Sequence, residues 1–203
     1  MDRRLVTVNE ALKNAVCDKK IYIVDGAKFR IAMVDHLNGM PYAAFNNDVI
    51  WADGERCPSV LVVMGDVVDF MSRHSETETK AFLRVVIGHE IGHLVDSLTN
   101  PFKPGFVNSI DREVVADAWA IDHCGDLKSY QCMMTELIST IDKLNRQYYV
   151  APLCAAFGIL NGASLRKRMR LAKKASGKKG GKRFDDIDEI VDIVIEVAKQ
   201  RYC

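Results

Sequence analysis

The chain has 203 residues, of which 48% are hydrophobic and 27% are charged, so it can bury a core and global disorder is excluded. Its 28 Lys and Arg against 27 Asp and Glu give a formal net charge of +1, which favours no class of partner. Residues 150–160 form the most apolar later stretch, about half the roughly 20 residues of a membrane span, and no signal-peptide pattern opens the chain. The six cysteines form no C-x-x-C pair, which indicates reduced thiols and a cytoplasmic location.

The first third predicts a short helix and then several strands. The capping box Thr7-x-x-Glu10 predicts a helix through Val16. The pair Asp25-Gly26 between two β-rich apolar runs predicts a tight hairpin. The predicted strands are Lys20–Val24, Lys28–Val34, Tyr42–Phe45, Val49–Trp51 and Ser59–Met64.

The rest of the chain predicts long helices, so the fold class is α+β, with a small mixed sheet in the N-terminal third and a mostly helical C-terminal half. A second capping box, Ser75-x-x-Glu78, opens the first long helix, and Asn100-Pro101 supplies its stop. The other predicted helices are Asp111–Asp122, Leu127–Tyr149 and Asp185–Tyr202. In the last of these, alternating Val and Ile residues leave a strand as the alternative.

The motif His89-Glu90-Ile-Gly-His93 lies within the first long helix. Two imidazoles four residues apart project from one helical face, as a shared Zn²⁺ requires. Glu90 is rotated by about 100° from His89, so it can act on a water molecule at the open fourth position instead of ligating the metal. The alternative is a pair of histidines that are merely solvated or satisfied in the core.

Gly88 and Gly92 each precede a motif histidine. A glycine in a helix interior costs about 1 kcal/mol relative to alanine, so another backbone should approach closely there to compensate. We expect that backbone to belong to the helix that brings the third ligand. The alternative is an ordinary helix-packing groove.

A catalytic zinc site needs a third protein ligand. Glu113 and Asp117 share one face of the next predicted helix, beside the small residues Ala116 and Ala120. We expect Glu113 to ligate the metal and Asp117 to accept the N–H of a ligating histidine and so fix its tautomer. The alternative is an ordinary solvated acidic face.

An H-E-x-x-H motif followed by Glu-x-x-x-Asp resembles the gluzincin metallopeptidases. The string from Arg112 to Ala120 resembles the R-E-x-x-A-D signature of Ste24/HtpX-like peptidases and the pattern of ImmA/IrrE-type peptidases. The resemblance, over Ser75–Ala120, implies a zincin core in which the sheet packs on the active-site helix and the strand Ser59–Met64 holds the substrate. Residues 1–163 would then be the metallopeptidase domain, 164–184 a basic linker and 185–203 a C-terminal amphipathic helix.

The implied activity is zinc-dependent hydrolysis of a protein or peptide bond, with one Zn²⁺ activating a water molecule and Glu90 as general base. Such enzymes add a residue that stabilises the oxyanion. The candidates are His123, Arg146, Tyr148 and Tyr149. His123 follows Glu113 by about 15 Å of helix, which makes it distant, and His36 and His74 are expected at the surface.

Ten Lys or Arg and no acidic residue occupy Ser164–Arg183. The cations from Arg166 to Arg183 predict nonspecific contact with nucleic acid or an acidic partner, and the alternative is a solvated helix end with a linker. A second hypothesis for the whole chain is therefore a zincin-fold binding or structural module in a nucleoprotein or other assembly, without proteolysis. A third is a nucleic-acid-binding protein whose H-E-x-x-H motif is incidental and binds no metal.

Overall fold

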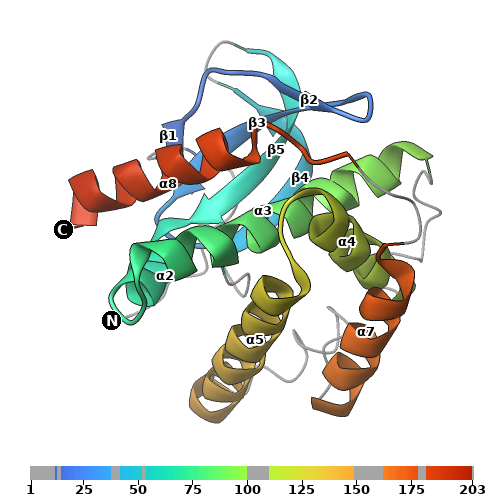
Figure 1. Ribbon diagram of the computed structural model, residues 1–203. Coiled ribbons are helices and arrows are strands. Elements are labelled where there is room, and N and C mark those ends of the chain that lie inside the picture. Colours follow the sequence, from blue (N-terminus) through green and yellow to red (C-terminus); the bar gives the residue numbers. More distant parts are fainter. Residues whose placement is uncertain are drawn as a thin grey trace.

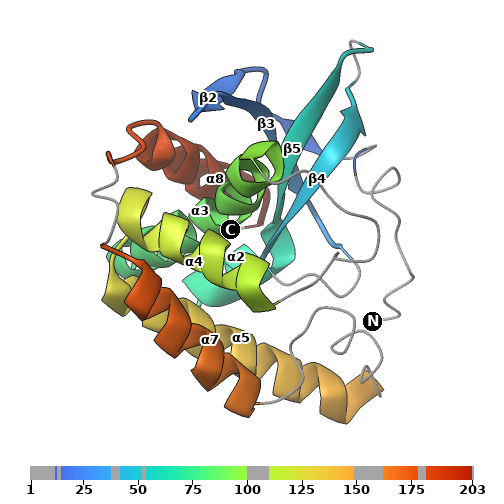
Figure 2. The ribbon, with the colours of Figure 1, turned by 90° about the vertical axis from the view of Figure 1, so that its right-hand side faces the viewer.

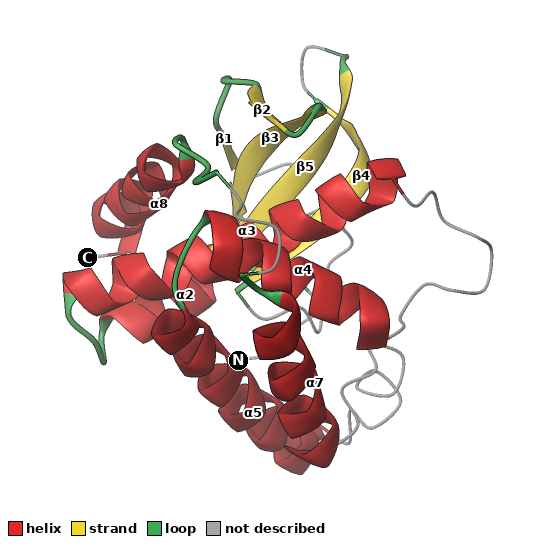
Figure 3. Ribbon diagram, turned by 45° about the vertical axis from the view of Figure 1, so that its right-hand side comes forward, coloured by secondary structure: helices red, strands yellow, loops and turns green. Residues whose placement is uncertain are grey.

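The computed structural model describes residue 12 and residues 15–37, 42–51, 54–99, 110–148, 162–177 and 182–202. These residues form a mixed sheet followed by helices, which confirms the α+β class (Figure 3). The strands are β1 Val16–Cys17, β2 Tyr22–Val24, β3 Ala27–Val34, β4 Ala43–Ile50 and β5 Arg56–Val63. The helices are α2 Met64–Met71, α3 Glu76–Thr99, α4 Ile110–His123, α5 Leu127–Tyr148, α7 Gly162–Ala175 and α8 Ile187–Tyr202.

The predicted hairpin at Asp25-Gly26 is confirmed. Both residues have positive φ, 48° at Asp25 and 82° at Gly26, as a tight hairpin turn requires. The turn joins β2 to β3 in antiparallel register. The main sheet has the order β1-β3-β5-β4, in which β3 and β5 run parallel and β4 runs antiparallel to β5.

Two sequence predictions about the strands are wrong. The two strands predicted at Tyr42–Phe45 and Val49–Trp51 form one strand, β4, from Ala43 to Ile50, whose pairing with β5 shifts between Asn46 and Val49. The strand predicted to hold substrate, Ser59–Met64, corresponds to β5, which is hydrogen-bonded to β3 on one side and to β4 on the other. The backbone of an interior strand is already hydrogen-bonded on both sides, so it cannot pair with an added strand. The edge strand beside β5 is β4.

The sequence analysis also missed α2. This helix follows β5 directly and buries Met64, Val67 and Phe70, which recur every three residues along one face. Gly65 and two adjacent valines have low helix propensity, and they conceal that periodicity in the sequence. Packing against the core therefore decides the conformation of this segment.

Helix α3 is the central element of the fold. Its capping box is confirmed, because the backbone N–H of Ser75 donates to Glu78 Oε2 (2.9 Å) and that of Glu78 donates to Ser75 Oγ (3.3 Å). The helix lies between the sheet and the helices α4, α5 and α7 (Figures 1 and 2). Its apolar residues, such as Leu83 and Ile91, are buried in the main core, so the histidine motif rests on a rigid support.

The C-terminal elements belong to the same folded body. Within 164–184, where the sequence predicts a linker, the structure forms α7 as far as Ala175, since Arg, Lys, Leu, Met and Ala are all good helix formers. Helix α8 matches the predicted amphipathic helix, and its apolar face lies in the main core. The predicted helix from Thr7 lies largely outside the described residues, as does Asn100-Pro101, but the helix's predicted last residue, Val16, belongs to β1 and pairs with Met33. None of the described helices is long and apolar enough to cross a membrane.

Candidate metal centre

The two motif histidines come from successive turns of α3. The ring centroids of His89 and His93 are 4.5 Å apart, and the rings lie edge to face. Both side chains retain some exposure, 10% for His89 and 19% for His93, so they lie at the boundary between core and solvent. This is the depth at which a metal could be held by protein and still meet a substrate.

Helix α4 crosses α3 at the two glycines, which confirms the predicted close approach. A Cβ on Gly92 would lie 2.8 Å from Cα of Ala116, and a Cβ on Gly88 would lie 2.7 Å from Cβ of Cys124. A side chain larger than hydrogen fits at Gly92 only if the backbone of α4 moves, and at Gly88 only if Cys124, which follows α4, shifts. An ion pair between Arg112 and Asp96, with Nε and Oδ2 3.1 Å apart, joins the same two helices near the start of α4.

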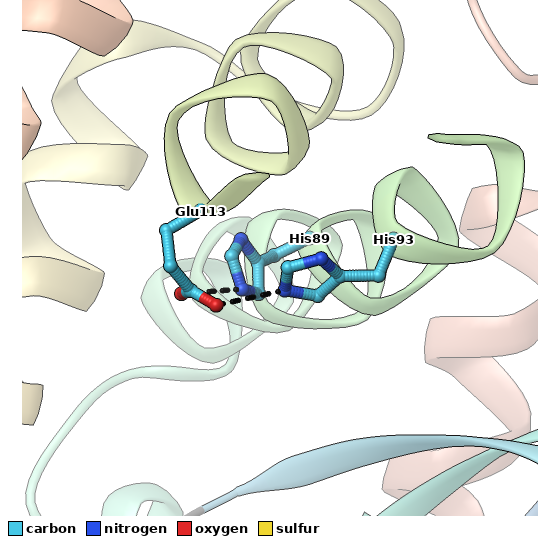
Figure 4. A group of neighbouring side chains, drawn as sticks. All are labelled: His89, His93 and Glu113. Carbon is cyan, nitrogen blue, oxygen red and sulfur yellow. Dashed lines mark ion pairs between the residues drawn. The ribbon is translucent and has the colours of Figure 1, made fainter. Parts of the chain in front are cut away.

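Glu113 projects from α4 toward both histidines (Figure 4). Its Oε2 lies 3.5 Å from Nε2 of His89, and its Oε1 lies 3.2 Å from Nε2 of His93. The three side chains each offer one ligand atom, and these atoms all lie within 4.8 Å of one another. Tetrahedral Zn²⁺ with bonds near 2.1 Å separates its ligand atoms by about 3.4 Å, close to the two distances from Glu113 to the histidines, and two imidazoles with one carboxylate are ligands that zinc accepts.

Asp117 lies one turn after Glu113 and is completely buried. Its Oδ1 is 2.9 Å from Nδ1 of His89, an ion-pair contact that leaves Nε2 directed at Glu113. The contact is close but poorly aligned, because Nδ1 of His89 has no partner of good hydrogen-bond geometry. A carboxylate at this nitrogen is the usual partner of a metal-ligating histidine.

Two further helices converge on Asp117. From α5, the hydroxyl of Tyr130 donates to Oδ2 at 2.8 Å. From α7, Arg168 donates through Nε to Oδ2 at 2.6 Å and through Nη2 to Oδ1 at 2.7 Å. Asp117 therefore joins four helices, because α3, α5 and α7 all reach this residue of α4.

Arg168 is the site residue that the sequence analysis missed. Its side chain is only 3% exposed, its Nη1 lies 2.7 Å from Oε2 of Glu113, and its Nη2 lies 3.5 Å from Nε2 of His89. In the sequence it is one of ten cations in a segment without acids, and no local pattern separates it from its neighbours. The one available signal is the helical phase of α7, which places Arg168 on the same side as Ala172 and Ala175.

The charges of this cluster determine its protonation. Burial by itself would lower the pKa of His89, but the carboxylates of Asp117 and Glu113 outweigh burial and raise the pKa to about 10. Burial would raise the pKa of both carboxyls, yet Arg168 and the histidines hold that of Glu113 well below its usual range and that of Asp117 at about 2. The carboxylates are therefore ionised at neutral pH, as metal ligation requires, whereas His89 must lose a proton to ligate.

The other predicted site residues lie as follows. Glu90 is partly exposed, and within the described part of the chain no hydrogen bond or ion pair involves it. His123, at the end of α4, stacks on Trp119 and contacts the carbonyl oxygen of Lys182 through Nδ1 (2.6 Å), so it is engaged away from the histidine motif. Side-chain positions of Arg146 and Tyr148 and all of Tyr149 lie outside the described structure.

The two histidines predicted at the surface differ in their exposure. His36 is exposed. His74 is half-buried, since it stacks on Phe70 with the ring centroids 4.1 Å apart and its Nε2 lies 3.8 Å from Oε1 of Glu136.

Comparison of the chain with protein-family models, with curated proteins and with solved structures finds no match.

Proposed function

We propose that this protein is a zinc-dependent metallopeptidase of the gluzincin type that hydrolyses a protein or peptide bond. One observation carries the proposal: two imidazoles from α3 and one carboxylate from α4 lie within 4.8 Å of one another. The assignment also draws on the position of Glu90, since a structural zinc site would not need an unpaired carboxylate beside its ligands.

His89, His93 and Glu113 would hold the ion. When bound, Zn²⁺ supplies Lewis acidity that polarises the scissile carbonyl and lowers the pKa of a water molecule toward about 7. Glu90 takes a proton from that water as its oxygen bonds to the carbonyl carbon, and passes the proton to the amine nitrogen as the C–N bond breaks. Its rotation of about 100° from His89 keeps it off the ligand face.

Asp117 and Arg168 support this arrangement without touching the reacting atoms. Asp117 holds Nδ1 of His89, and Arg168 holds both oxygens of Asp117. A bidentate guanidinium–carboxylate pair in a buried setting allows little rotation of either group. Arg168 is therefore a positioning residue that orients His89 through Asp117.

The substrate strand would add to β4, because β4 packs beside α3 at the edge of the main sheet. An extended peptide paired with an edge strand gains main-chain hydrogen bonds whatever its side chains. The substrate backbone would then extend the sheet beyond β4, the strand that contacts α3. In this proposal the substrate pairs with β4 and not with the interior strand β5, which the sequence analysis predicted.

A second candidate function is a zincin-fold binding module without proteolysis. The observation that favours it is the ion pair between Arg168 Nη1 and Glu113 Oε2 at 2.7 Å. A guanidinium that already satisfies this carboxylate competes with a metal ion for it. In this case the ion pairs of the cluster would stabilise the packing of the helices instead of holding a metal ion.

Zinc content and the variant Glu90→Gln together distinguish the two functions. The metallopeptidase should bind one Zn²⁺ per chain, and His93→Ala should lose it. Glu90→Gln should retain zinc and thermal stability but lose 10²–10⁴-fold in hydrolysis of a peptide identified from an unbiased library, or about 3–5 kcal/mol of barrier.

The exposed residue Glu196 on α8 provides the matched control, because Glu196→Gln makes the same chemical change far from the site and should leave hydrolysis unchanged. Full zinc occupancy with no cleavage by the native chain would support a binding module that holds zinc, whereas a folded chain that binds no zinc would support a module in which Arg168 keeps Glu113. A native chain free of zinc at micromolar zinc concentration would contradict the metallopeptidase proposal altogether.

A further inference from the structure

Helix α7 has two faces of different character. Arg168 and Ala172 are buried against the rest of the protein. The opposite side is cationic, and its exposed members are Arg166, Lys167, Arg170, Lys173 and Lys174. At 100° per residue these five positions fall within an arc of about 120°, so they form one continuous row, which we call the α7 cationic stripe.

The α7 cationic stripe is not neutralised within the described structure. Some surface cations elsewhere are paired with acids, such as Lys20 with Glu189 at 2.7 Å, Lys80 with Asp192 at 2.9 Å and Lys199 with Glu76 at 2.9 Å. Among the described residues, no ion pair or hydrogen bond joins a stripe side chain to an acid. The stripe is therefore a local concentration of positive charge on a chain whose net charge is only +1.

The stripe is also held in place. Arg168 anchors the middle of α7 by its bonds to Asp117 and Glu113. An isolated basic segment would bend and repel itself, but a helix fixed in the folded body presents its charges at constant spacing. From Arg166 to Lys174 the row is about 12 Å long, a length over which duplex DNA carries about seven negative charges.

We propose that the α7 cationic stripe binds the phosphate backbone of nucleic acid without reading its sequence. No aromatic residue lies on the described helix to stack on bases, so the contact is electrostatic. A membrane surface is disfavoured because amphipathic membrane helices insert an apolar face, and that side of α7 is packed in the protein. A protein partner is disfavoured because the stripe lacks the apolar or aromatic anchor of a stable interface. The proposal is independent of the metal centre.

The test is the salt dependence of binding. Binding of the full-length protein to a fluorescent 30-base-pair duplex of arbitrary sequence is measured by anisotropy over a range of salt concentrations. The slope of log K against log salt equals about −0.9 for each phosphate neutralised, so five contacts predict a slope of about −4.5. The triple variant Arg170→Gln, Lys173→Gln, Lys174→Gln should flatten the slope by about 2.7.

The matched control removes the same three charges elsewhere. The variant Lys19→Gln, Lys28→Gln, Lys128→Gln changes exposed lysines outside α7 and should leave the slope within about 0.5 of the native value. Circular dichroism and thermal unfolding of both variants confirm that each is folded.

Four results would overturn the proposal. One is an equal change in the salt-dependence slope for the α7 variant and for the control variant. Another is tighter binding to vesicles with 30% anionic lipid than to the duplex, and the third is equal affinity for a poly-glutamate peptide. Equal affinity for duplexes of different sequence supports the proposal, whereas strong preference for one sequence contradicts it.

Discussion

Helices α4 and α7 both bring charged groups to the histidines of α3, but they do so by opposite means. Helix α4 comes close to α3 at two glycines, with its backbone against Gly92 and with the side chains of Ala120 and the following Cys124 against Gly88. Helix α7 reaches the same cluster through one long side chain, Arg168. Close contact demands small residues at a fixed period, which are visible in a sequence. A long ionic side chain demands only one residue, and that residue looks like its neighbours.

The two kinds of contact also differ in how their loss would change the free energy of unfolding. Contact between α3 and α4 depends on fit, so its loss would be graded with the volume introduced. The contact of Arg168 with buried Asp117 and partly exposed Glu113 depends on charge balance, so its loss would leave two anions with only the histidines to offset them. We therefore expect substitutions at Arg168 to be the more damaging, although the sequence draws attention to the glycines.

The largest expected effect is that of Arg168→Met. The variant keeps most of the side-chain volume but leaves Glu113 and Asp117 without their guanidinium, and breaking a buried pair by removing one partner costs about 3–5 kcal/mol. Urea unfolding measures this loss. Arg170→Met is the control, since it changes an exposed residue of the same helix and should stay within about 0.5 kcal/mol of native. Equal effects of the two variants would show that Arg168 is not an anchor.

The next largest effect is expected at Asp117, the residue of α4 that Arg168 of α7 contacts. Asp117→Asn should weaken zinc binding by 10–100-fold, because an amide holds Nδ1 of His89 less firmly than a carboxylate does. Glu113→Gln should weaken it further, since that change alters a ligand. Competition with a fluorescent zinc chelator measures both affinities. A larger loss at Asp117 than at Glu113 would exchange their roles and exclude a gluzincin site.

The smallest effect is expected in the contact between α3 and α4. Gly92→Ala places a methyl group 2.8 Å from Cα of Ala116, so the backbone of α4 must shift, at about 1–3 kcal/mol after the gain in helix propensity is included. Gly88→Ala meets the side chain of Cys124, which can adjust more readily than a backbone. Thermal unfolding should therefore rank Gly92→Ala as the more destabilising, and the reverse order would contradict the backbone contact.

Several features could be predicted because each depends on neighbours in the chain. Asp25-Gly26 forms a turn by local backbone preference, and Ser75 caps α3 through a residue three positions away. The spacing of His89 and His93 follows from the helical repeat alone. The close approach of α4 to α3 could also be predicted, because a glycine in a helix interior costs free energy that a closely packed backbone can offset.

Other features depended on the partners that the chain meets on folding. The edge position of β4, the helical state of Met64–Met71 and the burial of Arg168 are decided by contacts with distant segments. Arg168 lies 51 residues from Asp117 and 79 from His89, and no period or cap connects them in the sequence. The sequence by itself thus determined the start of α3, the hairpin turn and the helical spacing of the two histidines, since these follow from local backbone geometry. The tertiary structure alone decided which strand is the edge and which of ten cations enters the site, because burial and charge pairing exist only once distant segments have packed together.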